Sequence, residues 1–447
     1  MPLSKPAGGD SHPSTPEDFF VPNGSSAVFT GASARLKLSI CLITYNRSRY
    51  LRKTLSHLFE NLRPSFSYEV IVSDNASTDD TPQVVADFGN DHPQIRYIRQ
   101  KRNVGPESNM VSAFHHARGE YSLYLADDDQ LVPDALIRVL QFMDEHPDVG
   151  TCHCPWEMWN DVDKKSTGTF YRVPEPVQFS KQESITLCSY ILQNHIFPEI
   201  CVFRTDVVQR IMYHPRLNYY AFVHLINALD HAKVAFLPIA YYRFVVLHWA
   251  DDRRTQHGNE QATSSWDTYR GGLEAMIHWA YRLRGSPGVP SERSDSIGKA
   301  LQTFVHARMR VALRLLIQKK DFLGAHDVLL RLLAGHGISQ SEADRARTSV
   351  TARAALQMAA EIVEAATPLA GIGLYRLSNA AEVKAIFEEL RPNLPVSFVE
   401  RGELASQKVT QMLLITGDND GRDELLHAGC APGFVKVYHD LIRLFSA

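Results

Sequence analysis

Between residues 36 and 150 the chain alternates short apolar runs with amphipathic segments, and this alternation limits the possible folds more than any other feature. Runs typical of buried strands occupy residues 38–44, 68–73, 95–99 and 121–126. In the first intervening segment, leucines recur at the spacing of one helix face: Leu51, Leu55, Leu58 and Leu62. Strands alternating with helices predict an α/β fold with a mainly parallel sheet covered on both faces.

Polar clusters follow three of these strands at the points where the strands end. They occupy residues 44–47, 74–80 and 127–129. In open parallel sheets, ligands bind outside the carboxyl ends of the strands. The clusters therefore predict a single ligand site, built by residues 38–135.

The third cluster consists of three adjacent carboxylates, Asp127, Asp128 and Asp129, which repel one another unless a partner offsets their charge. Mg²⁺ or Mn²⁺ would offset it, because both prefer oxygen ligands, and either ion could also bridge a diphosphate. A solvated acidic turn before the helix that begins at Pro133 is the alternative. The two neighbouring polar strand ends favour the metal site.

Changes in pattern along the chain predict four segments. Residues 1–35 are rich in Pro, Gly and Ser without the apolar core of a signal peptide, so we expect a disordered tail. Residues 36–260 are expected to form the main domain, with halves at 36–135 and 150–260. Residues 261–365 have helical periodicity and predict a helical domain.

The last segment, residues 366–447, returns to alternation of strands and helices. Strands are expected at 372–377, 396–401, 412–416 and 434–438. This pattern resembles a small Rossmann-type unit, but its first turn lacks the glycines that let backbone approach a pyrophosphate. We therefore expect an interaction domain, through which the chain could form a homo-oligomer.

Composition argues against several classes of protein. The net charge is −3 and the 47 Lys and Arg are spread along the chain, so no basic face for nucleic acid is expected. No run of 18 apolar residues is present, so no transmembrane segment is expected. Six scattered cysteines predict a reducing, cytoplasmic setting, and Cys152-His153-Cys154 lacks the second ligand pair of a zinc finger.

Four sequence blocks together resemble the bacterial family 2 glycosyltransferases of the GT-A fold. They are Ile43 to Arg47, Val72 to Asp79, Asn103 to Gly105 and Leu125 to Asp129. The resemblance covers about residues 36 to 250. It implies a GT-A-type nucleotide-sugar-binding domain, followed here by the helical region and the small α/β domain.

The resemblance also implies roles for residues around the donor nucleotide. Thr44 and Tyr45 would form the floor of the base pocket, and Arg47 would lie near the base or the phosphates. Asp74 would accept a hydrogen bond from a base N–H. Neighbouring loop positions would shape the same pocket: Asn75 and Asn103.

The acidic motif of the family is shifted here. Its Asp-x-Asp falls on Ala126, Asp127 and Asp128, so alanine replaces the first acid. The resemblance implies Asp128 as the metal ligand, with Asp127 or Asp129 contacting the ribose or a metal-bound water. His248 would reach the metal or the diphosphate.

Residues after His248 and in the acceptor half complete the predicted site. Arg253 and Arg254 could clamp the diphosphate, because guanidinium groups bind phosphate bidentately, or could belong to an exposed charged loop. Tyr220 and Ala221 occupy the place where the family carries the acid pair that supplies the catalytic base. Two other residues are candidates for that base: His224 and Glu199.

The expected function is metal-dependent, inverting transfer of a hexose or deoxyhexose to a hydroxyl of a glycan or small-molecule acceptor. The donor would be a sugar linked to UDP, dTDP or GDP. An inactive glycan- or nucleotide-sugar-binding scaffold is an alternative, motivated by Ala126 and the missing acid pair. A sugar nucleotidyltransferase is a second alternative, but residues 44–47 lack the glycine-rich loop that this class needs.

Overall fold

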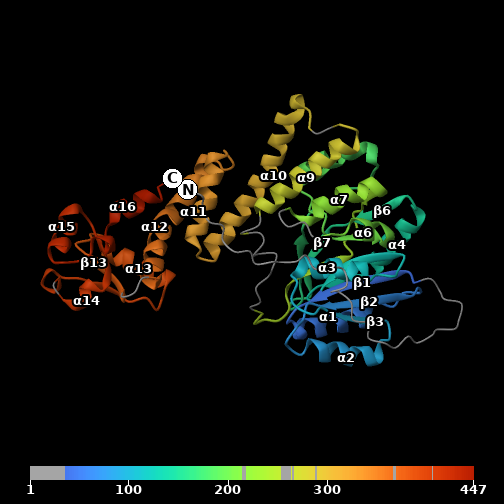
Figure 1. Ribbon diagram of the computed structural model, residues 1–447, viewed down its shortest axis with the longest axis horizontal. Helices are drawn as coiled ribbons and strands as arrows, with labels where there is room; N and C mark the ends of the chain where they lie inside the picture. Colours follow the sequence, from blue (N-terminus) through green and yellow to red (C-terminus); the bar gives the residue numbers. More distant parts are fainter. Residues whose placement is uncertain are drawn as a thin grey trace, which may run out of the picture. The chain divides into compact units, whose positions relative to one another are not determined.

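The computed structural model describes residues 36–213, 218–252, 263, 266–286, 289–365, 369–404 and 406–446 (Figure 1). These residues form two compact units. The first comprises the described residues up to 252 and those from 271 to 294, and the second comprises those from 263 to 270 and from 295 onward. The predicted four-part division differs from this grouping at residues 260 and 365 and remains a prediction.

An eight-stranded sheet forms the centre of the first unit, with strand order β3-β2-β1-β4-β10-β6-β11-β9. Four strands pair in parallel at one side of the sheet: β1 (Leu38–Thr44), β2 (Tyr68–Asp74), β3 (Ile95–Arg99) and β4 (Tyr121–Ala126). The others are β6 (Val149–His153), β9 (Val177–Phe179), β10 (Cys201–Arg204) and β11 (Lys233–Phe236). The predicted α/β fold with a mainly parallel sheet is confirmed.

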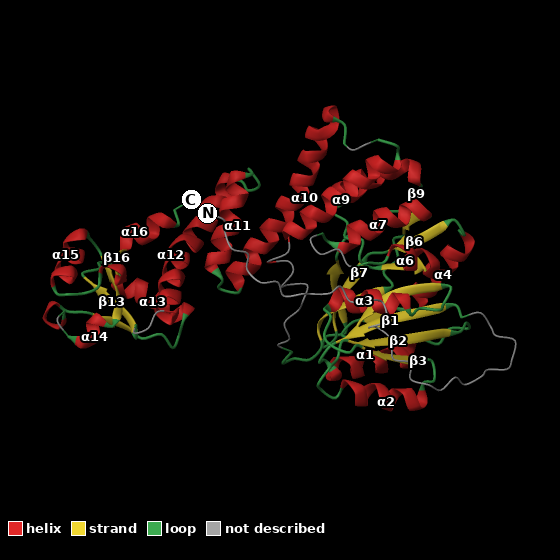
Figure 2. Ribbon diagram, viewed as in Figure 1, coloured by secondary structure: helices red, strands yellow, loops and turns green. Residues whose placement is uncertain are grey.

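Helices cover both faces of the parallel strands, as Figures 1 and 2 show. α1 (Ser48–Asn61) and α2 (Thr81–Asp91) lie on one side of β1 to β3, and α3 (Pro106–His115) lies on the other. The predicted leucine face of α1 is buried. Gly105 precedes α3 with a φ of 88°, a conformation that glycine adopts without strain, and Pro106 begins the helix.

A second, four-stranded sheet in the first unit has the order β5-β12-β7-β8. Its strands are β5 (Gln130–Leu131), β7 (Trp156–Asn160), β8 (Lys165–Thr169) and β12 (Tyr242–Leu247). β5 directly follows the acidic triplet and pairs with β12, so the triplet lies beside a strand from far along the chain. The remaining helices that lie wholly within this unit are α4 (Pro133–Glu145), α5 (Ser184–Gln193), α6 (Thr205–Ile211) and α7 (Tyr220–His231).

Long helices and a small parallel sheet make up the second unit. α9 (Trp266–Leu283) and α10 (Ser291–Gln318) extend across the boundary between the units, and α11 (Phe322–Ala334) and α12 (Gln340–Ala365) follow. The sheet has the order β14-β13-β15-β16, with β13 (Gly371–Tyr375), β14 (Val396–Phe398), β15 (Met412–Thr416) and β16 (Val435–Val437). Its helices are α13 (Ala380–Leu390), α14 (Gln407–Thr410), α15 (Asn419–His427) and α16 (Tyr438–Leu444).

The predicted strand 396–401 is too long. β14 ends at Phe398, and a 3₁₀ helix forms at Arg401–Glu403. Glu403 accepts a hydrogen bond from the backbone N–H of Glu400, and this capping favours the helical turn over an extended strand.

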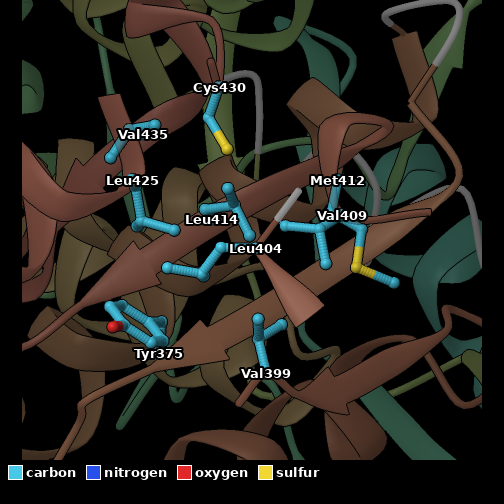
Figure 3. Close-up of a cluster of buried hydrophobic side chains, with 9 residues drawn as sticks. All are labelled: Tyr375, Val399, Leu404, Val409, Met412, Leu414, Leu425, Cys430 and Val435. Atoms are coloured by element: carbon cyan, nitrogen blue, oxygen red, sulfur yellow. The ribbon is translucent and has the colours of Figure 1, made fainter. Parts of the chain in front are cut away.

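A buried cluster fills the core of this small sheet (Figure 3). Its members are Tyr375, Val399, Leu404, Val409, Met412, Leu414, Leu425, Cys430 and Val435. Tyr375 ends β13, is only 2% exposed, and donates a hydrogen bond to Glu424. Its ring thus belongs to the core at the strand end where a Rossmann unit has a small glycine turn. The predicted absence of nucleotide binding by this unit stays a prediction.

Gln357 links two helices of the second unit, and its replacement by leucine should destabilise them. Its buried Oε1 accepts hydrogen bonds from the backbone N–H groups of Phe322 at 2.8 Å and Leu323 at 3.3 Å, at the beginning of α11. Leucine would leave both groups without that acceptor, which costs about 1–3 kcal/mol. Urea denaturation should show a lower midpoint for Gln357→Leu and an unchanged one for the exposed control Gln340→Leu. Equal midpoints would contradict the capping role.

Among the described residues, no helix is both long enough and apolar enough to cross a membrane.

Candidate functional site

The structure brings the three predicted polar clusters to one edge of the large sheet. β1 pairs with β2 on one side and with β4 on the other, so their carboxyl ends are neighbours. Thr44 lies opposite Asp74 in the register, and Ile43 lies opposite Ala126. The acidic triplet therefore begins beside the end of β1, as the strand-end argument predicts.

Asp127 is buried and held by two donors from the β1 end. Thr44 Oγ1 donates to its Oδ2 at 2.7 Å, and Arg47 Nη1 donates to its Oδ1 at 2.9 Å. Burial, together with the charge of Asp128, raises the pKa of Asp127 to about 7, although Arg47 and Thr44 act in the opposite direction. The carboxylate of Asp127 is thus held in place against the end of β1.

Asp128 shares the guanidinium of Arg47, whose Nη1 lies 2.9 Å from Asp128 Oδ2. Burial alone would lower the pKa of Arg47, but Asp127 and Asp128 raise it above its ordinary value. The guanidinium of Arg47 therefore pairs with both carboxylates. Carboxylate oxygens at a strand end are the ligands that a divalent cation such as Mg²⁺ prefers.

Asp129 turns away from the other two acids toward β12. Its Oδ2 accepts from the Tyr242 hydroxyl at 2.8 Å, and its Oδ1 accepts from the backbone N–H of Val245 at 2.9 Å. Both oxygens of a buried carboxylate are thus engaged by one strand. Asp129 connects the triplet to the second sheet.

The residues predicted at the metal, Asp128, Asp129 and His248, have different surroundings. Within the described ranges, no group of three or more His, Cys, Asp or Glu side chains is arranged to hold a metal ion. Asp129 is engaged by β12, and the ring of His248 packs against Tyr50 on α1 with centroids 5.2 Å apart. The roles of these three residues at a metal stay predictions.

Asp74, the residue predicted to accept from the base, is completely buried. Its Oδ1 accepts from the backbone N–H of Ser77 at 2.8 Å, and its Oδ2 accepts from the Tyr97 hydroxyl at 2.6 Å. Arg99 Nε lies 3.4 Å from the same Oδ2. Tyr45, predicted to stack on the base, is 41% exposed.

Tyr97 and Arg99 are absent from the sequence-based site. Both lie within β3 rather than after a strand end, so the strand-end rule passes over them. The composition of β3 could have indicated them, because this edge strand contains two arginines and a tyrosine as well as two isoleucines.

Asn75 and Asn103 bind each other rather than projecting separately. Asn75 Nδ2 donates to Asn103 Oδ1 at 2.9 Å, and Asn75 Oδ1 accepts from the backbone N–H of Val104 at 2.8 Å. Asn103 Oδ1 also accepts from the N–H of Gly105. These bonds connect the two loops that were predicted to shape the base pocket.

Both candidate bases line the same small pocket, together with Tyr220 and Ala221. His224 is buried, and its Nε2 lies 2.9 Å from the carbonyl oxygen of Tyr213, so this nitrogen donates a proton to the bond. Glu199 is partly exposed, and burial raises its pKa from 4.5 to about 7. In the part of the chain that the structure describes, no residue donates a hydrogen bond to its carboxylate.

The segment after β12 lies on α1. The Tyr50 hydroxyl donates to Asp252 Oδ1 at 2.8 Å, and Lys53 Nζ donates to the carbonyl oxygen of His248 at 2.9 Å. The predicted diphosphate clamp, Arg253 and Arg254, lies outside the described residues.

Comparison with known proteins relates the first part of the chain to a family of glycosyltransferases. The family model described as glycosyl transferase family 2 matches residues 39–211. An uncharacterised protein of Mycobacterium tuberculosis is 36% identical over 120 residues, which are 26% of this chain and 34% of that protein. An abequosyltransferase of Salmonella typhimurium is 31% identical over 132 residues, or 29% of this chain and 37% of that enzyme. The chain thus matches about a third of the length of these relatives.

Among solved structures, S. aureus TarS 1–349 in complex with UDP-GlcNAc is similar with a TM-score of 0.47 and 18% identity, over 72% of this chain and 86% of that one. The matched family model spans β1 to α6 and includes the whole acidic strand end. This part of the chain, residues 39–211, is therefore similar to glycosyl transferase family 2.

Proposed function

We propose that this chain transfers a sugar from a nucleoside-diphosphate donor to an acceptor hydroxyl. The observation that carries the proposal is the pair Asp127 and Asp128, which both contact Arg47 at the end of β4, on the same sheet edge as the buried Asp74. A pair of acids at a strand end can bind a metal and a diphosphate, and the neighbouring part of the edge can bind a base. Relatives named as abequosyl-, glucosyl- and N-acetylglucosaminyltransferases support sugar transfer and leave a hexose or deoxyhexose open.

The residues present fit a divalent cation that is held jointly with the donor. Mg²⁺ binds through one or two carboxylates together with substrate phosphates, and Asp128 supplies one such carboxylate. Arg47 neutralises Asp127 at the same time, so the second acid need not be a ligand. When bound, the cation would stabilise the charge that develops on the departing diphosphate.

For the acceptor side, we propose Glu199 rather than His224 as the general base of an inverting reaction. The base must take the proton of the acceptor hydroxyl as that oxygen attacks the anomeric carbon, while the diphosphate leaves from the opposite face. Glu199 is a partly exposed residue, and burial of its carboxyl group raises the pKa to about 7, close to the working range of a general base. His224 is buried, and one of its ring nitrogens already donates to Tyr213.

Release of nucleoside diphosphate tests the proposal directly. The full chain should be incubated with UDP-, dTDP- and GDP-sugars, with and without Mn²⁺, and with simple glycoside acceptors. Acceptor-dependent, Mn²⁺-dependent release with one donor class is expected. Saturable donor binding without turnover on any acceptor would favour the scaffold alternative, for which Ala126 at the first acid position is the specific observation.

A further inference from the structure

The carboxylate of Asp74 has no surface that a ligand could touch. Its side chain is 0% exposed, although it lies at the strand end where the base pocket is proposed. A nucleobase can therefore hydrogen-bond to it only after one of its present neighbours moves. Three groups bind the carboxylate: the N–H of Ser77, the hydroxyl of Tyr97 and the guanidinium of Arg99.

These three groups differ in how readily they can leave. The Ser77 N–H belongs to the backbone of a turn in which Ala76 has a φ of 64°, so moving it would rebuild the loop. Arg99 is also bound to the carbonyl oxygen of Ser77, at 2.7 Å. Tyr97 is a side chain on the edge strand β3 with 39% exposure, so its hydroxyl can exchange Asp74 for water by rotation.

We propose that the Tyr97 hydroxyl holds the position on Asp74 Oδ2 that a ring N–H of the donor base takes when the nucleotide binds. This inference rests on the proposed function, because it concerns the same donor site. It makes Tyr97 a specificity-determining residue. A base that displaces the hydroxyl must bring its own donor, since a carboxylate only accepts hydrogen bonds.

The chemistry of the bases then defines the donor class. Uracil, thymine and guanine carry a ring N–H on the edge used for base pairing. Cytosine and adenine carry an unprotonated ring nitrogen at the corresponding position, which would face the carboxylate as a second acceptor. Displacement of Tyr97 therefore selects UDP, dTDP or GDP and rejects CDP and ADP.

Removing the hydroxyl should tighten nucleotide binding. In the wild type, the base exchanges one hydrogen bond to Asp74 for another, whereas in Tyr97→Phe the carboxylate has lost this partner before the base arrives. We expect Tyr97→Phe to bind its nucleotide on the order of tenfold more tightly than the wild type does. This applies to each of UDP, dTDP and GDP that the wild type binds, because the net free energy of a hydrogen bond to a charged group corresponds to a change in affinity of this order. CDP and ADP should gain nothing.

Isothermal titration calorimetry of the full chain with these five nucleoside diphosphates tests the proposal. Tyr68→Phe is the matched control, because Tyr68 also has a hydrogen-bonded hydroxyl, with Gln94 Nε2 at 3.3 Å, but begins β2 at the opposite end of the strand from Asp74. Its affinities should equal those of the wild type. Circular dichroism and melting temperature verify that each variant is folded.

A double variant tests whether the effect of Tyr97→Phe on nucleotide binding depends on Asp74. Asp74→Ala alone should weaken binding of the ring N–H nucleotides about tenfold, and adding Tyr97→Phe to it should produce no gain. The proposal is overturned if Tyr97→Phe changes nothing, weakens binding, tightens all five nucleotides equally, or still tightens binding without Asp74. If no nucleotide binds to the wild type or to any variant, both this proposal and the proposed function are contradicted.

Discussion

Asp128→Asn is expected to lower turnover on the order of 10²–10³-fold while leaving the fold intact. The substitution keeps the size of the side chain but removes the charge that would bind a cation beside the diphosphate. Arg47 would still be paired with Asp127, at 2.9 Å, so the strand end keeps its internal compensation. Donor turnover and Mn²⁺-linked nucleotide binding should both fall, whereas the melting temperature should change little.

Asp129→Asn is the matched control, because it makes the same chemical change one residue later. Its two oxygens accept from Tyr242 and from the backbone of Val245, so the loss should appear mainly as lower stability. We expect a decrease of about 1–3 kcal/mol in the free energy of unfolding, with Mn²⁺-linked binding retained. The assignment of the metal ligand would be reversed if Asp129→Asn abolished the Mn²⁺ dependence and Asp128→Asn preserved it.

The position of the acid pair could be predicted from the sequence because it depends on local rules. Apolar runs fix the parallel strands, and the edge where their carboxyl ends meet follows from the direction of the strands. The structure confirms the predicted strand 121–126 as β4, immediately before Asp127. The same reasoning located Thr44 at the end of the neighbouring strand β1, and Asp74 beside Thr44 at the end of β2.

Orientation of the individual acids could not be predicted in the same way. The hydroxyl that fixes Asp129 belongs to Tyr242, 113 positions later in the chain. No local pattern reveals that β12 returns beside β5, so the sequence left open whether Asp127 or Asp129 contacts the donor. Tyr97 was missed for a related reason, because an aromatic residue inside a strand is typical of core packing.

The pocket that joins Glu199 and His224 also depends on tertiary structure. Glu199 directly precedes the segment that leads into β10, and His224 lies on α7. The sequence identified both as possible bases but had no means of comparing their environments. Hydrogen bonding and burial in the folded chain distinguish them, because His224 donates to a carbonyl and burial raises the pKa of Glu199.

Glu199→Gln is expected to lower turnover about 10²–10⁴-fold without weakening nucleotide binding, if Glu199 is the general base. The wild-type rate should rise with pH and level off above about 7, because only the ionised carboxylate can take a proton and burial raises its pKa to about 7. In Glu199→Gln this rise should disappear from the residual rate. His224→Gln should retain it, with a loss of no more than a few-fold.

Glu199→Gln should also increase the free energy of unfolding at high pH. This increase distinguishes a carboxylate that is removed from water from an ordinary carboxylate on the surface. Below a pH of about 4.5, Glu199 is protonated in both folded and unfolded chains, so wild type and Glu199→Gln should be equally stable. Between about 4.5 and 7 the unfolded chain releases the proton first, so the wild type loses stability as pH rises. Above 7 the cost is constant and could reach about 3 kcal/mol, from the size of the pKa shift.

Chemical denaturation of both proteins at pH 4.5 and pH 8 measures this difference, with Glu157→Gln as the control. Glu157 forms an ion pair with Arg243 at 2.9 Å, so its loss should not stabilise the protein at either pH. If Glu199→Gln is more stable and turns over more slowly than the wild type at pH 8, the fold retains a carboxylate that lowers its stability at the place where the reaction needs a base. If the variant is fast, or if its stability follows that of the wild type at both pH values, Glu199 is not that base and the proton acceptor lies elsewhere in the site.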